Sequence, residues 1–303
     1  MSHRRAVVLM VCVTLLWSMA GIVTRQLDSA RGFETTFWRS AFNALALVLM
    51  LGWLRGPATL ARTLRRGGRS LWISGACWCV MFTAFMLALS LTSVANVLVT
   101  MALSPLFTAL GARFVLGHRL APRTWVAIVV AGAGIGWMYG EQLGSGDLRQ
   151  WLGTAVALGV PIAAAVNWTL LQHLYRSADR TAPPPDMLAP VLLGAMLSAA
   201  LTLPLSLPFA ATGRDLALLG LLGVVQLAIP CLLAVRVARV LSAPEVSLLS
   251  LLEVVFGVLW VWWLSAEAPS AAVLGGGLLV LGALAGNEAL ALRRSPAASL
   301  QPR

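Results

Sequence analysis

Glu253 is the acidic side chain with the strongest case for chemistry, because it lies in the middle of a long apolar run. A charge near the midplane of a bilayer costs at least ~2.5 kcal/mol, so such a carboxyl should face a cavity or a partner, or carry a proton. Ser250 lies three residues earlier, on the same helical face. The pair could exchange a proton or attract the ammonium group of a solute. The alternative is a neutral carboxyl that is hydrogen-bonded within a helix bundle.

A second polar face is predicted around Asn96 and Thr100, which lie four residues apart and therefore on one side of a helix. Ser104 and Pro105 follow in the same apolar run. Proline removes a helical hydrogen bond and frees a carbonyl group, and Pro230 should do the same in a later run. We expect these positions to line a cavity, although kinks that only shape the bundle are the alternative.

Arg39 falls near the start of another apolar run, where it could pair with Glu34, pair with an acid from another helix, or extend to the membrane surface. We expect a gate or a structural ion pair at Arg39 in preference to a contact with substrate. Gln226 is a polar side chain within a run, where hydrogen bonding between helices is the common role.

Aromatic side chains well inside apolar runs could form the wall of a pocket for an aromatic or amphipathic solute. Packing in the bundle core is the competing interpretation. The residues concerned are Trp17, Trp78, Phe82, Phe85 and Trp168, and Trp78, Phe82 and Phe85 share a helical face.

The composition identifies the class of protein. Of the 303 residues, 59% are hydrophobic and 11% are charged, whereas a soluble domain carries about 25% charged residues. The apolar runs are about 20 residues long, which predicts an all-α integral membrane protein. The net charge of +11 comes from arginines placed between these runs, so it indicates topology and excludes nucleic acid as a partner.

Neither a catalytic set nor a metal site is predicted, and no cofactor is expected. The chain has three His residues with no ligand-like spacing, and its four Cys residues lie inside apolar runs.

Ten transmembrane helices are expected, and the arginines are distributed so that both termini lie in the cytoplasm, with 17 in cytoplasmic segments and 4 outside. The predicted spans are Ala6–Thr24, Thr35–Leu54, Leu71–Leu91, Val94–Leu116, Thr124–Gly140, Trp151–Leu174, Met187–Leu207, Leu216–Val235, Val246–Leu264 and Ala271–Leu292.

The two halves of the chain resemble each other weakly, since aligning Ser93 with Ser242 pairs Ser104 with Glu253. We expect a first five-helix repeat at 1–140, a connection at 141–150, a second repeat at 151–292 and a cytoplasmic tail at 293–303. Five spans per half is an odd number, so the second repeat should be inverted, as in many transporters. Glycines of the fifth and tenth spans, notably Gly282 and Gly286, predict a packing or dimer interface.

Several motifs resemble those of the EamA-type ten-helix exporters of the drug/metabolite transporter superfamily. They are Leu16-Trp17-Ser18, Phe37-Trp38-Arg39, "FMLALSLTSVANVLVTMALSPLFTALGARFVLGHRL" and "LLSLLEVVFGVLWVWWLSAEAPS". His118 stands where the family usually has Glu, and Val254 stands where Pro usually follows Glu253.

This resemblance implies a secondary transporter of the inner membrane that exports small metabolites by alternating access. Within the family, the chain most resembles the YddG-like aromatic amino acid exporters, and this resemblance implies an amino acid-like substrate. Carriers of cationic drugs or nucleotide sugars are the alternative, and an intramembrane enzyme is a remote one. The oligomeric state is left open.

Overall fold

The computed structural model describes residues 1–116, 148–177, 187–241, 243–264 and 271–293, together with some positions between 122 and 137. Within these residues the secondary structure is helical and no strand occurs. The elements are α1 His3–Ser18, α2 Ala20–Thr24, α3 Gly32–Arg55, α4 Pro57–Arg66, α5 Arg69–Leu91, α6 Val94–Met101, α7 Ser104–Leu116, α9 Leu148–Ser177, α10 Ala189–Thr202, η1 Leu203–Leu205, α11 Gly213–Leu221, η2 Leu222–Ala228, α12 Ile229–Val237, α13 Ala243–Leu264 and α14 Ala271–Arg293.

The all-helical class is confirmed for the described residues. Five of their helical segments are long and apolar enough to cross a membrane: His3–Thr24, Gly32–Arg55, Arg69–Leu91, Leu148–Leu174 and Gly213–Val237. Shorter apolar helices occur as well, among them Asn96–Gly111 and Ala189–Leu205. The ten-span count stays a prediction. About half of the predicted fifth span lies outside the described residues, as do most of the 141–150 connection and the 293–303 tail.

Three of the apolar segments are interrupted. Met19 separates α1 from α2, and the predicted fourth span is divided into α6 and α7 at Ala102 and Leu103. Pro105 lies in the first turn of α7, where its missing N–H is tolerated. The segment Gly213–Val237 contains the π-helix η2 between two α-helices, and π turns occur frequently at functional sites.

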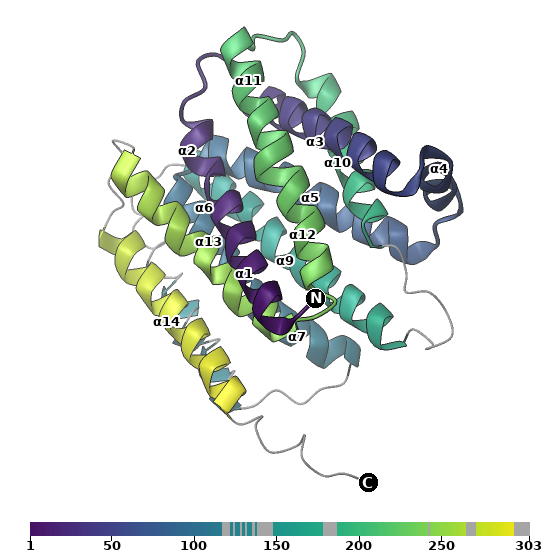
Figure 1. The fold of residues 1–303 in the computed structure, drawn as a ribbon. Helices are drawn as coiled ribbons and strands as arrows, with labels where there is room; N and C mark the ends of the chain where they lie inside the picture. Colours follow the sequence, from purple (N-terminus) through teal and green to yellow (C-terminus); the bar gives the residue numbers. More distant parts are fainter. Residues whose placement is uncertain are drawn as a thin grey trace.

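The helices pack as one bundle in which α5 lies against both α9 and α10, and α1 lies against α12 and α13 (Figure 1). Small and hydroxyl side chains permit the close approach of α5 and α10. A Cβ at Gly194 would clash with Trp78. Ser198 of α10 shares hydrogen bonds of 2.8 Å with both Ser40 of α3 and Thr83 of α5, which satisfies two buried hydroxyl groups and one half-buried one.

Two buried carboxylates fasten the α2–α3 loop and the start of α11 to each other. Glu34 of α3 accepts the N–H groups of Ala210 and Ala211 at 2.9 Å. Asp215 of α11 accepts the N–H groups of Asp28, Ser29 and Ala30 from the other side. We call this pair of contacts the carboxylate clasp. Pairing with Glu34 was one of three alternatives for Arg39, and the structure places the Glu34 carboxylate on backbone groups instead.

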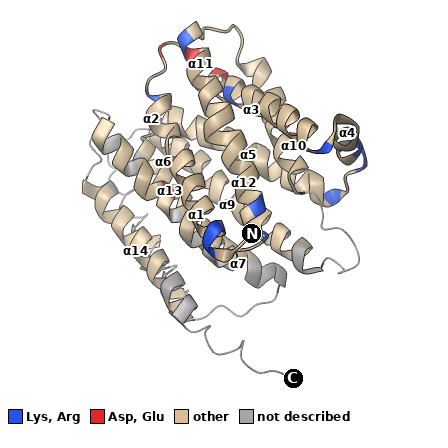
Figure 2. Cartoon of the chain, in the orientation of Figure 1, with Lys and Arg blue, Asp and Glu red and all other residues tan. Residues whose placement is uncertain are grey.

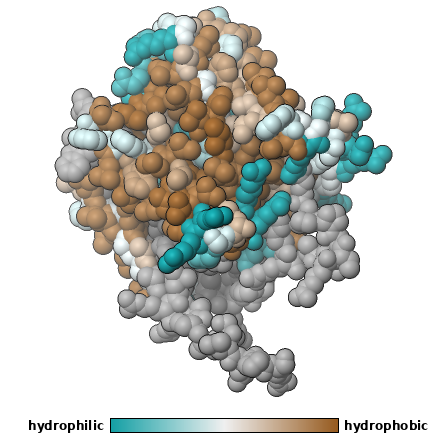
Figure 3. Space-filling model, viewed as in Figure 1, coloured by the Kyte–Doolittle hydropathy of each residue, from teal (hydrophilic) through white to brown (hydrophobic). Residues whose placement is uncertain are grey.

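Charged residues lie mainly at the ends of the helices, around α11, along α4 and beside the N-terminus (Figure 2). The face seen in Figure 3 is predominantly hydrophobic over α1, α12 and α13. The short helix α4 was not predicted. Leu60 and Leu64 lie on its packed side, while Arg62, Arg65 and Arg66 lie on the other side.

Candidate functional site

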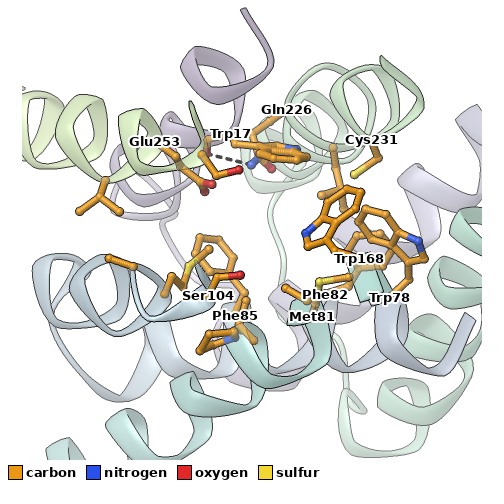
Figure 4. A pocket seen from close by; sticks show the side chains of 18 of the residues that line it. Trp17, Trp78, Met81, Phe82, Phe85, Ser104, Trp168, Gln226, Cys231 and Glu253 are labelled. Carbon is orange, nitrogen blue, oxygen red and sulfur yellow. Dashed lines mark hydrogen bonds between the residues drawn. The ribbon is translucent and has the colours of Figure 1, made fainter. Parts of the chain in front are cut away.

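A cavity lies in the middle of the bundle, between α1, α3, α5, α7, α9, η2 and α13 (Figure 4). The non-protein space in it amounts to about 860 Å³, part of which is open to the outside. The volume within it that a water molecule can reach is about 120 Å³, below the usual range of small-molecule sites, so the cavity suits a small solute. Its wall combines many apolar side chains with a few polar ones, which is the usual composition of a ligand site.

One side of the cavity is aromatic. The rings of Trp78 and Phe82, both on α5, lie 5.4 Å apart, and Trp168 of α9 meets Trp78 edge to face at 6.3 Å. These spacings are typical of favourable aromatic pairs. Figure 4 shows the three rings together with Met81 on the same side of the cavity. This side can hold an apolar or aromatic group.

The opposite side carries oxygen atoms. Glu253 and Ser250 of α13 line the cavity with Ser104 of α7, and Figure 4 shows Glu253 and Ser104 away from Trp78 and Trp168. The Ser250 hydroxyl donates to the carbonyl oxygen of Val246 at 2.8 Å, so it still has acceptor capacity toward the cavity. Glu253 is 8% exposed. The two sides together favour an amphipathic solute.

Arg39 also lines the cavity and is buried, with 2% of its surface exposed. Its Nε and Nη2 atoms donate to the Gln226 Oε1 atom at 3.3 and 2.8 Å. The guanidinium carbon lies 5.5 Å from the centre of the Phe85 ring, within the range of a cation–π contact. Arg39 therefore lines the cavity and does not extend to the membrane surface as one alternative predicted.

Gln226 is held on both sides. Its Nε2 atom donates to the Trp17 carbonyl oxygen at 3.0 Å, the contact drawn as a dashed line in Figure 4. Trp17 precedes the interruption between α1 and α2. The side chain thus connects α1, α3 and η2 through three hydrogen bonds at the cavity wall.

The π-helix comes unusually close to α3. A Cβ at Gly223 would lie 2.7 Å from the Arg39 carbonyl oxygen and 2.8 Å from the Asn43 backbone nitrogen. No larger residue fits there without moving one backbone against the other. The missing side chain at Gly223 is therefore what brings Gln226 within hydrogen-bonding reach of Arg39.

Most of the residues singled out from the sequence lie on this cavity, although their part in binding stays a prediction. The cavity-lining members are Trp17, Arg39, Trp78, Phe82, Ser104, Pro105, Trp168, Gln226, Ser250 and Glu253.

Asn96, Thr100 and Pro230 do not line the cavity, which corrects the expected placement of these three. The break between α6 and α7 is the reason for the first two, because residues before it do not keep the helical register of Ser104 and Pro105. The Asn96 amide donates to Thr92 Oγ1 at 3.0 Å, and the Thr100 hydroxyl donates to the Asn96 carbonyl oxygen at 2.7 Å. Pro230 lies where the π-helix continues into α12, and its missing N–H leaves one carbonyl oxygen of the preceding helical turn without a helical donor, as expected.

Eight lining residues were not singled out from the sequence: Met81, Met101, Ala102, Val160, Ala164, Leu227, Cys231 and Val254. Phe85, which the sequence places on the same helical face as Trp78 and Phe82, lines the cavity with them. Nothing in the sequence distinguishes Cys231 from an ordinary core residue. Among the described residues no group of three or more His, Cys, Asp or Glu side chains could hold a metal ion.

The predicted glycine interface is divided between two environments. Gly134 packs against α14, because a Cβ there would lie 2.8 Å from the Gly276 carbonyl oxygen. A Cβ at Gly282 or Gly286 would meet nothing within 4 Å, so those two glycines do not pack within the described part of the chain. Gly136 and His118 lie outside the described residues.

Comparisons with known proteins agree with this picture. Residues 4–140 match the model of the EamA-like transporter family. No curated protein matches the chain. One solved crystal structure aligns with 97% of this chain and 100% of its own, with a TM-score of 0.66 and 20% sequence identity, which shows a shared fold. Together with the five long apolar helices, the family match indicates a multi-pass membrane protein.

Proposed function

We propose that this chain is a secondary transporter of the EamA-like family that exports amphipathic metabolites, foremost amino acids with apolar or aromatic side chains. The observation that carries the proposal is the two-sided cavity in the middle of the bundle. Trp78, Phe82 and Trp168 supply an apolar wall, and Glu253 with Ser104 supplies oxygen atoms opposite. The match of residues 4–140 to a transporter family supports the same conclusion.

The proposed architecture is ten membrane spans in two inverted repeats, with both termini in the cytoplasm. The proposed location is the inner membrane of the cell. The family match supports this division, since it ends at residue 140, where the first repeat is predicted to end. The positions of the arginines support the orientation. Inverted repeats allow the cavity to open to either side of the membrane in turn.

In this mechanism the solute binds at the middle of the bundle with its apolar group against the tryptophans. The interrupted helices α1–α2 and α6–α7 supply ends that line the cavity, and such interruptions are tolerated in a membrane where they face a cavity. Glu253 attracts a positively charged group of the solute or carries a proton in exchange for it.

The test is transport by the purified full chain in liposomes. Vesicles are loaded with labelled tryptophan, phenylalanine or leucine, and in parallel with a nucleotide sugar or a cationic dye. We expect export of the amino acids and acceleration when unlabelled amino acid is present on the opposite side, because a carrier with one alternating site exchanges its solutes. A protein that moves or exchanges none of these compounds is not the proposed transporter.

Glu253→Gln tests the role of the carboxylate. We expect amino acid export to fall at least tenfold with a proton gradient, without one, or under both conditions. Glu34→Gln is the matched control, since Glu34 is a buried carboxyl outside the cavity. Both N–H groups bound by Glu34 donate to its Oε1 atom, which glutamine retains. Wild-type transport by Glu253→Gln under both conditions would remove Glu253 from the mechanism.

A further inference from the structure

Arg39 has one side of its guanidinium group without a partner. The Nε and Nη2 atoms both donate to Gln226 Oε1, whereas the buried Nη1 atom has no hydrogen-bond partner among the described residues. Arg39 also lines the cavity. A buried charged donor without an acceptor is costly, so the free Nη1 atom points to a ligand that completes its bonding.

The charges on the cavity wall restrict what that ligand can be. Gln226 is neutral and does not compensate the guanidinium charge, while the Glu253 carboxyl lines the same cavity. A solute bearing only a phosphate dianion would be repelled by Glu253, and an amine lacking an anionic group would leave Nη1 unsatisfied. A zwitterion satisfies both side chains, because its carboxylate can meet Arg39 and its ammonium group can meet Glu253.

We infer that Arg39 is the carboxylate-recognising residue of the site and that its preferred solutes are α-amino acids with an apolar side chain. The inference rests on the proposed function and assigns each part of the solute to the side chains that contact it. The solute carboxylate accepts hydrogen bonds from Nη1 of Arg39, the ammonium group lies toward Glu253, and the side chain lies against Trp78, Phe82 and Trp168.

Gln226 acts as a positioning residue in this scheme. It binds Arg39 through Oε1 and the Trp17 carbonyl oxygen through Nε2, so both ends of its amide are committed to the wall. Phe85 lies against the guanidinium group. Together these contacts fix the plane of the guanidinium group and leave Nη1 as the donor for the solute.

Three probes with the same indole ring separate the contributions. Tryptophan has both charged groups, tryptamine lacks the carboxylate, and indole-3-propionate lacks the ammonium group. Each competes with labelled tryptophan for the purified full chain in detergent. We expect wild-type protein to bind tryptophan about 10- to 100-fold more tightly than either analogue, the effect of losing one charge-assisted hydrogen bond.

Two variants assign the carboxylate contact. In Arg39→Gln the preference for tryptophan over tryptamine should fall to about onefold. In Gln226→Glu a carboxylate beside Arg39 takes the place of the solute carboxylate, so tryptamine should bind more tightly than tryptophan. Arg31→Gln is the control at the start of the same helix, because the Arg31 guanidinium donates only to backbone carbonyl groups of residues 27, 28 and 30. It should retain the wild-type preference.

The ratio of two affinities in one preparation does not depend on the amount of folded protein, so a partly unfolded variant still gives an answer. The inference is overturned if wild-type protein binds none of the probes, or if Arg39→Gln keeps the wild-type preference for tryptophan. Transport without this preference would leave the proposed function standing and refute the role of Arg39. A protein that binds tryptophan with this preference but transports nothing would support the role of Arg39 and refute the proposed function.

Discussion

Asp215 offers the sharpest test of how the cavity is held together. This carboxylate is completely buried and accepts four backbone N–H groups, from Asp28 at 2.7 Å, Ser29 at 3.0 Å, and Ala30 and Thr212 at 3.1 Å. Asp215→Ala would leave all four without their acceptor. It would also release the α2–α3 loop from α11.

The magnitude follows from these bonds. A hydrogen bond to a charged group contributes about 1.5–3 kcal/mol, but three of the four donors share Oδ2, and water can reach loop backbone that is set free. We therefore expect Asp215→Ala to lower the free energy of unfolding by about 3–4 kcal/mol. Asp215→Asn keeps one carbonyl oxygen for the three donors and turns an NH2 group toward the N–H of Asp28. Its cost should be about 1–2 kcal/mol.

Thermal unfolding of the purified chain in detergent measures this order. At about 2–4 °C per kcal/mol for a chain of this size, the melting temperature should fall by about 10 °C in Asp215→Ala and about half as much or less in Asp215→Asn. Asp28→Asn is the control, because its ion pair with Arg214 is largely exposed and contributes at most about 1 kcal/mol. The reasoning fails if Asp28→Asn is as damaging as Asp215→Ala, or if Asp215→Ala melts like the wild type.

Three further outcomes are expected. Gly223→Ala should lower the free energy of unfolding by about 1–3 kcal/mol and weaken tryptophan binding, because a Cβ there meets the backbone of α3. Gly220→Ala is the control, since the atoms nearest to its Cβ are ring carbons at 3.9 Å. Equal behaviour of the two variants in melting and binding assays would contradict the close contact. Ser198→Ala should lower the melting temperature by an amount equivalent to about 1–3 kcal/mol, because the hydroxyl groups of Ser40 and Thr83 lose their shared partner. An unchanged melting temperature would argue against that hydrogen-bond network. Trp168→Ala should reduce binding of tryptophan in the competition assay more than binding of alanine, because only the larger solute reaches the aromatic wall; equal losses would place that solute elsewhere.

The class of fold and many of the cavity positions could be predicted because they depend on local pattern. Long apolar runs identify membrane helices, and a charged residue such as Glu253 within one is stable only where it finds a cavity or a partner. The hairpin at Thr92 and Ser93 also follows from two polar residues between two runs, and the Ser93 hydroxyl caps α6 by accepting from the Asn96 N–H.

The positions that escaped prediction depend on how helices rotate and meet. A continuous helix through Val94–Leu116 would put Asn96 and Ser104 in one register, but the interruption at Ala102 and Leu103 removes that relation. The partner of Arg39 lies 187 residues away in the sequence, and Gln226 carries no local mark that distinguishes it from other polar residues in membrane helices.

Helix α4 did leave a signal, because Pro57 follows Gly56 and leucines at 60 and 64 share one face. A span-by-span count of hydropathy does not detect so short a helix.

The π-helix Leu222–Ala228 also has a consequence for comparing this chain with its relatives. A π turn accommodates more residues than an α turn over the same rise, so it behaves as a local insertion inside an apolar segment. A relative with a regular α-helix here would align correctly only with a gap in the middle of the segment, where gaps are usually disfavoured. Alignments made without that gap would shift every residue on one side of it, and would pair Gln226 with a position that faces a different direction in the relative.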